Sequence, residues 1–187
     1  NGAVDVQQGF LLTRHWRDTP AGTQVEFWLA TDNGPRLLRL PPQTSVAFLP
    51  AQQRTQAEAL LVDEPGVELR PLGLKDFHQR PVLGLYCQQH RQLIDLDKRL
   101  RRAGIDVFEA DVRPPERYLM ERFITAQVMF TGTNAVDGDA NGPLLDAQIK
   151  PCTEYRPNLK LASLDIETNA FGELYSIAIE GCGQRNV

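Results

Sequence analysis

The stretch that decides the fold runs from Val82-Leu-Gly-Leu-Tyr86 through residues 90–103 to Gly104-Ile-Asp-Val-Phe108. The first segment is a short apolar run typical of a buried strand. In residues 90–103 the apolar side chains recur at helical spacing and form one stripe, made of Leu93, Leu96, Leu100 and Ala103. Gly104 suits the left-handed conformation that stops a helix. The stretch therefore predicts a strand–helix–strand unit that ends in a returning strand at 105–108.

The chain before this unit predicts further strands and a second unit of the same kind. Val25, Phe27 and Leu29 alternate with polar or outward residues, which is the period of a strand with one buried face. The turn formers Asp32-Asn-Gly-Pro35 separate this strand from the next apolar segment. The remaining predicted elements are strands at 10–16, 37–40, 46–49 and 67–69 and a helix at 50–62.

Beyond the unit, Pro114-Pro115 predicts the start of a third helix that reaches about Phe123. Residues 132–143 are rich in Gly, Asn and Asp and predict a surface loop or the end of a long hairpin. The segment Tyr155-Arg-Pro-Asn158 has the composition of a domain boundary. We expect an α+β fold in which residues 1–150 form a mixed β-sheet domain with β-α-β units, and residues 151–187 begin a second domain.

Composition sets limits on the class of protein. Hydrophobic residues make up 42% and charged residues 24% of the chain, as in proteins that bury a core. No apolar run approaches the roughly 18 residues that span a bilayer, so no membrane partner is expected. Three widely spaced cysteines and the lack of a signal-peptide pattern favour free thiols in a cytoplasm. The net charge of −4 argues mildly against a stand-alone DNA-binding module.

The segment Leu161-Ala-Ser-Leu-Asp-Ile-Glu-Thr168 carries the strongest chemical signal. If it is a strand, Asp165 and Glu167 leave one face, because residues two apart on a strand point the same way. Two converging carboxylates suit hard divalent cations, and a pair of such cations can activate water and stabilise the leaving oxygen in phosphodiester hydrolysis. The same pattern also suits a strand whose two acids face water.

The residues around this segment favour the hypothesis that Asp165 and Glu167 bind divalent cations. Residues 169–172 can turn the chain, and Leu174–Ile179 predicts a second apolar strand, so that the acids lie near the turn of a hairpin. Exonucleases of the ribonuclease H-like fold with an Asp-x-Glu first motif begin in this way.

Longer motifs give the chain a family resemblance. The segment Phe108–Phe123 resembles the one that family B DNA polymerases carry between their amino-terminal and exonuclease domains, and Leu164–Thr168 resembles their first exonuclease motif. The order of these two motifs along the chain and the number of residues between them both fit that family. The segments Phe10–Arg17 and Leu74–Pro81 are similar to the bacterial polymerase II branch of that family.

The resemblance implies a DNA-directed DNA polymerase with a 3′–5′ proofreading exonuclease. It implies that Asp165 and Glu167 hold the exonuclease Mg²⁺ or Mn²⁺ ions, and that the partners are a DNA primer-template, deoxynucleoside triphosphates and domains encoded after Val187. The other carboxylates, the tyrosine that orients the water and the palm aspartates are expected there too. Because Mg²⁺ requires near-octahedral oxygen coordination, the 187 residues alone are expected to bind no metal firmly and to be inactive.

For residues 1–150 the resemblance implies a domain that frames the single-stranded template. Arg113, Arg117 and Arg122 are candidate contacts to template phosphates, although Arg117 and Arg122 could also cap or pair within their own helix. The scattered His15, His78 and His90 are expected to pack or to lie at the surface, and Trp16 and Trp28 are expected in the core.

Two other functions fit the same residues. The first is a separate ribonuclease H-like exonuclease without a polymerase, and the reading frame after Val187 would distinguish it. The second is a nucleic-acid-binding module whose carboxylate strand is only structural. A salt titration of binding to single-stranded DNA tests that module, since phosphate contacts make affinity fall with salt.

Overall fold

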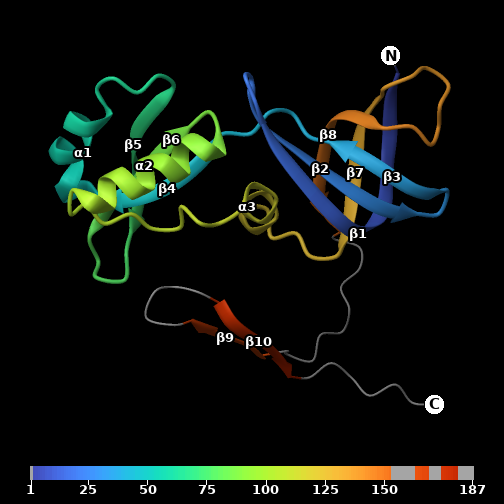
Figure 1. The fold of residues 1–187 in the computed structure, drawn as a ribbon. Helices are drawn as coiled ribbons and strands as arrows, with labels where there is room; N and C mark the ends of the chain where they lie inside the picture. The colour runs from blue at the N-terminus through green and yellow to red at the C-terminus, as the bar shows by residue number, and fades with distance from the viewer. Residues whose placement is uncertain (1, 153–162, 169–173, 181–187) are drawn as a thin grey trace. The chain divides into compact units, whose positions relative to one another are not determined.

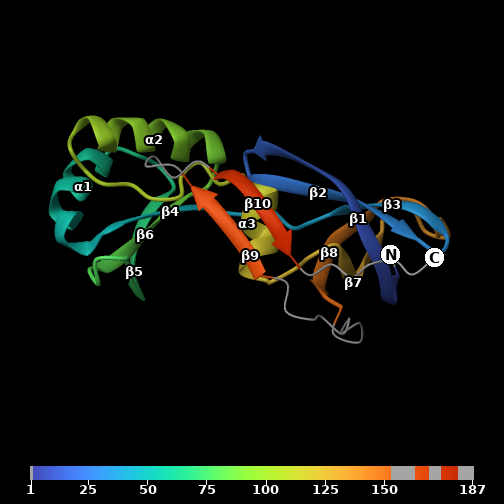
Figure 2. The ribbon, with the colours of Figure 1, turned by 90° about the horizontal axis from the view of Figure 1, so that it is seen from below.

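The computed structural model describes residues 2–152 in full and the strands at 163–168 and 174–180 by their backbone pairing. It divides the chain into two compact units, residues 1–152 and 153–187. The first unit contains a β-barrel, a smaller α+β lobe and one helix between them (Figures 1 and 2). The α+β class predicted from the sequence is confirmed.

Five strands close the barrel in the order β1-β2-β3-β8-β7. They are β1 (Ala3–Thr19), β2 (Gly22–Thr31), β3 (Gly34–Arg39), β7 (Gln127–Asn134) and β8 (Leu144–Pro151). All pairs are antiparallel except β3 with β8. The long β1 pairs with β2 and also with β7, and its register shifts at Leu11–Thr13 and Val4–Gln7 are irregularities of the kind that bend a strand around a barrel.

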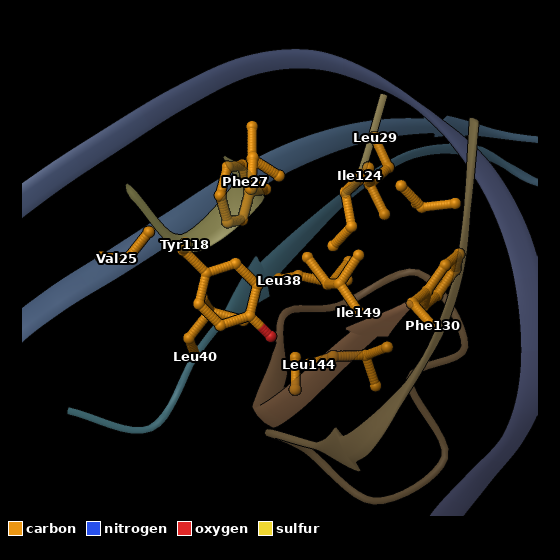
Figure 3. Packing of buried hydrophobic residues seen from close by; sticks show 13 residues of the cluster. Val25, Phe27, Leu29, Leu38, Leu40, Tyr118, Ile124, Phe130, Leu144 and Ile149 are labelled. Carbon is orange, nitrogen blue, oxygen red and sulfur yellow. The ribbon is translucent and has the colours of Figure 1, made fainter. Parts of the chain in front are cut away.

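The barrel encloses one of two hydrophobic cores. Phe27, Leu38 and Phe130 point into it from three strands (Figure 3). The helix α3 (Pro114–Glu121) closes one end, with Tyr118 and Leu119 both 7% exposed. The Tyr118 ring lies 6.0 Å from the Phe27 ring. The barrel and α3 therefore share a core.

The smaller lobe is a three-stranded antiparallel sheet covered on one face by helices. Its strands are β4 (Ser45–Pro50), β5 (Val67–Lys75) and β6 (Pro81–Cys87), in the order β4-β6-β5. The helices are a short 3₁₀ turn (Ala51–Gln53), α1 (Arg54–Leu61) and α2 (His90–Arg102). Three residues of the predicted stripe, Leu93, Leu96 and Leu100, belong to the second core together with residues of β4 and β6. Ala103, which was predicted on the same stripe, is exposed because it lies at the end of the helix.

The predicted returning strand at 105–108 is wrong. Ile105 and Val107 are buried as expected, but the segment makes only one isolated bridge, between Phe48 and Phe108. Phe108 exchanges both backbone hydrogen bonds with Phe48 on the edge strand β4, at 2.7 and 3.0 Å, and this single bridge does not extend into a strand. Trp28 is also not in the core, because it lies on the outer side of β2 and is 42% exposed.

In the second unit, β9 (Ser163–Thr168) pairs antiparallel with β10 (Leu174–Glu180), as the sequence predicted. The turn predicted at 169–172 and the boundary predicted at 155–158 lie outside the described residues. Within the described part of the chain, no helix is long and apolar enough to cross a membrane.

Candidate functional site

The two candidate metal ligands lie in β9. Asp165 is paired with Ala178 of β10, and Glu167 with Ser176. Both acids thus occupy strand positions two residues apart, which the two-carboxylate hypothesis requires. Their roles as metal ligands stay a prediction.

A complete metal site would need further ligands. Among the residues that the structure describes, no group of three or more His, Cys, Asp or Glu side chains is placed to hold a metal ion. The predicted pair on β9 would therefore have to be joined by ligands from elsewhere.

Arg117 is engaged within the fold. Its Nη1 lies 3.0 Å from Glu109 Oε2, and its Nη2 donates to the Glu109 carbonyl oxygen at 3.3 Å. The guanidinium also lies 5.4 Å from the centre of the Phe48 ring, and the side chain is 13% exposed. Arg117 therefore ties α3 to the smaller lobe, and of the three predicted arginines it has the least surface for a phosphate.

Arg122 lies at the end of α3 and is more open. Its Nη1 donates to the Tyr118 carbonyl oxygen at 3.2 Å, and the guanidinium is 3.6 Å from the centre of the Tyr118 ring. Glu121 Oε2 is 3.8 Å away, and the Arg122 side chain is 40% exposed. The stack on Tyr118 holds the guanidinium in place and leaves part of it accessible.

Arg113 precedes α3 and is exposed. Its carbonyl oxygen accepts a hydrogen bond from the Arg117 amide at 2.9 Å, which starts the helix. The structure thus places Arg117 within α3 and the other two predicted arginines at its two caps, with Arg113 and Arg122 open to solvent.

His90 is buried, 5% exposed, with its ring edge-on to Trp16 at 4.9 Å between centroids. Burial lowers the pKa of His90, although the nearby Asp18 carboxylate opposes this. His15 and His78 are exposed. The expectation that the histidines pack or lie at the surface is confirmed.

Asp18 was missed by sequence reasoning. Its carboxylate accepts hydrogen bonds from the His90 and Arg91 amides at 2.9 and 3.0 Å, and from the Thr23 hydroxyl at 2.8 Å. Partial burial favours the protonated acid, but these hydrogen bonds outweigh it and lower the pKa of Asp18. The carboxylate caps α2 from the end of β1, so it joins the smaller lobe to the barrel.

A groove beside α3 was also missed. It has a volume of about 500 Å³ and is lined from three parts of the chain: the segment after β3, α3, and β8. No local pattern joins these segments. Only the exposed Gln148 and Lys150, which alternate with buried neighbours on β8, could have hinted at a polar surface there.

Two family models match adjacent parts of the chain. Residues 9–44 match "DNA polymerase II, N-terminal", and residues 45–105 match "DNA polymerase II, insertion domain". The boundary between the matches lies between β3 and β4, where the chain passes from the barrel into the smaller lobe.

One relative and one solved structure extend these matches. The chain is 60% identical over 182 residues to DNA polymerase II of Escherichia coli (strain K12), which covers 97% of this chain and 22% of the relative. The family B DNA polymerase of the archaeon Pyrobaculum calidifontis matches 74% of this chain and 19% of its own, with a TM-score of 0.60 and 15% identity. The latter similarity concerns the fold.

Proposed function

The chain belongs to the DNA polymerase II family, and on that premise we propose that it is the amino-terminal part of a DNA-directed DNA polymerase with a 3′–5′ proofreading exonuclease. The observation that carries the proposal is the 60% identity over 97% of the chain. The chain spans about a fifth of the length of that relative, so polymerisation and proofreading are functions of the longer protein. We place this protein in the bacterial cytoplasm.

Asp165 and Glu167 would be exonuclease metal ligands in this protein. Their carboxylate oxygens are the donors that Mg²⁺ and Mn²⁺ prefer, and their spacing on β9 suits a shared site. A bound pair of such ions supplies an activated water and stabilisation of the leaving oxygen. Because a pair of acids fills only part of an octahedral shell, the 187-residue chain alone would cleave no DNA.

Residues 1–150 would frame the single-stranded template as a domain of their own. Of the three predicted arginines, Arg113 and Arg122 are the two that are exposed and so open to a template phosphate. Arg117 would act mainly by holding α3, through Glu109 and Phe48. The DNA primer-template and deoxynucleoside triphosphates are the substrates of the longer protein.

The decisive experiment uses the protein extended through its downstream reading frame. Asp165→Ala and Glu167→Ala should each lower 3′–5′ exonuclease activity roughly 100-fold or more, since loss of even an outer partner of a metal ligand costs 10–100-fold. Polymerase activity on a matched primer should stay within twofold. Asp63→Ala, which removes an exposed acid after α1, is the matched control.

Two results would contradict the proposal. One is unchanged exonuclease activity in both carboxylate variants. The other is strong Mg²⁺-dependent nuclease activity of the 187-residue chain that Asp165→Ala abolishes, because the site would then be complete without downstream ligands.

A further inference from the structure

A small cavity lies where the smaller lobe meets α3, the helix between the lobe and the barrel (Figure 1). Its volume is about 30 Å³. Residues 43–46 line it at the start of β4, His90 lines it at the start of α2, and Arg117 and Tyr118 line it from α3. These segments are far apart in the chain, so only the folded structure assembles the cavity.

Ser45 brings an unpaired polar atom to this cavity. The residue is 6% exposed, and its hydroxyl oxygen Oγ is buried without a hydrogen-bond partner among the described residues. A hydroxyl that leaves water on folding and gains no other partner costs free energy, and such groups are rare in native proteins. The Ser45 hydroxyl therefore needs a partner within the cavity.

His90 brings a second polar group to the same cavity. It is 5% exposed, its ring packs edge-on to Trp16, and its backbone amide donates to Asp18. Within the part of the chain that the structure describes, neither ring nitrogen of His90 forms a hydrogen bond. A neutral imidazole has one N–H donor and one acceptor nitrogen. Ser45 and His90 thus present matching hydrogen-bonding groups from two different elements.

The size and polarity of the cavity suit water. A cavity of roughly 10–15 Å³ holds one water molecule when it offers two to four polar partners, whereas an apolar cavity stays dry. The volume of about 30 Å³ therefore has room for one or two water molecules. Ser45 and His90 supply two partners, and the charged side chains of Arg117 and Glu121 also line the cavity.

We propose that this cavity binds an ordered water molecule that bridges the Ser45 hydroxyl and the His90 ring. The water completes the hydrogen bonding of both buried groups, so it is part of the folded structure. Because His90 also contacts Trp16 of β1, the water connects β4 to the place where α2 meets the barrel. The bridge concerns how the lobe is held against the barrel, and it does not depend on the proposed function.

A crystal structure of the 187-residue chain that shows ordered solvent tests the bridge directly. We expect an electron-density peak within about 2.5–3.2 Å of both Ser45 Oγ and a ring nitrogen of His90. The same peak should be weaker or absent in Ser45→Ala. A well-ordered cavity in the parent chain without this peak would overturn the proposal.

Ser45→Ala also distinguishes a bridged hydroxyl from an unpaired one by the sign of its effect on the melting temperature. With the water in place, the variant loses a hydrogen bond, and the melting temperature should fall by about 2–4 °C for a chain of this size. An unpaired hydroxyl would instead be a buried polar group that alanine removes, so the melting temperature would stay the same or rise. Either of these two results would contradict the bridge.

His90→Phe tests the second partner, because phenylalanine keeps a ring beside Trp16 but has no ring nitrogen. Ser45→Ala and His90→Phe remove hydrogen bonds of one water molecule, so the shift of the double variant should be smaller than the sum of the single shifts. His78→Phe, at an exposed histidine between β5 and β6, is the matched control, and its shift should add to that of Ser45→Ala. Additive shifts in both pairs would overturn the proposal.

Discussion

The helices α2 and α3 end in the same hydrogen-bonding motif, but with different residues at its centre. After α2, the Ile105 amide bonds the Leu100 carbonyl at 3.0 Å, and the Gly104 amide bonds the Arg101 carbonyl at 3.0 Å. After α3, the Ile124 amide bonds the Leu119 carbonyl at 2.9 Å, and the Phe123 amide bonds the Met120 carbonyl at 3.2 Å. This pattern is the Schellman motif.

The central residue of each motif is left-handed, with φ of +81° at Gly104 and +54° at Phe123. Glycine adopts this conformation freely, whereas a side chain with a Cβ atom costs about 1–2 kcal/mol there. The α2 end therefore carries no backbone strain at this position. The α3 end has a bulky, exposed phenylalanine at the same position, so its motif is the more strained of the two.

The two helices also begin differently. Neither has a side-chain cap from its own N-cap residue, Gln89 or Arg113. α2 receives the Asp18 carboxylate from the end of β1, 72 residues earlier than His90. α3 begins with Pro114-Pro115, whose missing N–H groups need no acceptor. The capping of α2 therefore depends on an acceptor from the barrel, whereas the first turn of α3 needs no such acceptor for its two prolines.

Asp18→Ala should have the largest effect on stability. It leaves two amides of the first turn of α2 and the Thr23 hydroxyl without their acceptor, and hydrogen bonds to a charged group contribute about 1.5–3 kcal/mol. The free energy of unfolding should fall by about 2–3 kcal/mol in urea titrations. Asp18→Asn, which keeps an oxygen acceptor, should lose less; equal stability of Asp18→Ala and the parent would contradict this role.

Gly104→Ala tests the α2 end. An added Cβ would meet no atom within 4 Å, so the cost comes from the backbone alone. Allowing for the lower entropy of the unfolded alanine chain, we expect a loss of about 1 kcal/mol. If the free energy of unfolding changed by less than about 0.3 kcal/mol, the motif would tolerate a side chain at both helix ends.

Mild acid should reduce stability by a smaller amount. The pKa of His90 is lowered in the fold, so between that value and about 6.5 the unfolded chain binds a proton that the folded chain does not. Stability should therefore fall as pH drops below about 6.5. The lowered pKa of Asp18 acts in the same direction below about pH 3.8. Melting temperatures measured at successive pH values should fall below about pH 6.5 in the parent chain. This decrease should be absent in His90→Gln.

Phe123→Gly should have the smallest effect on stability and the opposite sign to Gly104→Ala. Relief of about 1–2 kcal/mol of backbone strain is partly offset by the greater freedom of glycine in the unfolded chain. We expect a gain of about 0–1 kcal/mol by urea titration. A clear loss of stability would contradict this expectation and would mean that the Phe123 ring contributes to the packing of the fold.

Local patterns predicted much of this molecule. The leucine stripe of α2, its stop at Gly104 and the helix at Pro114-Pro115 depend on neighbours in the sequence, and the structure has each of them. For β7 and β8 the sequence predicted only the loop or hairpin end between them. In β7 the apolar Met129 occupies an outward position, so the alternation of apolar and polar residues that marks a strand is less clear. The prediction of a strand at 105–108 was wrong because apolar alternation indicates which side chains are buried. It does not indicate whether the backbone forms a ladder with a neighbouring strand.

By itself the sequence determined the helices, the paired strands that carry Asp165 and Glu167, and the family, since each depends on short periods or on contiguous motifs. Only the tertiary structure decided that β3 meets β8 to close the barrel, that Asp18 caps α2, and that Arg122 and Lys150 share a groove. These contacts join residues that are far apart in the chain. No local period encodes them, because their free energy arises only when the whole core is packed.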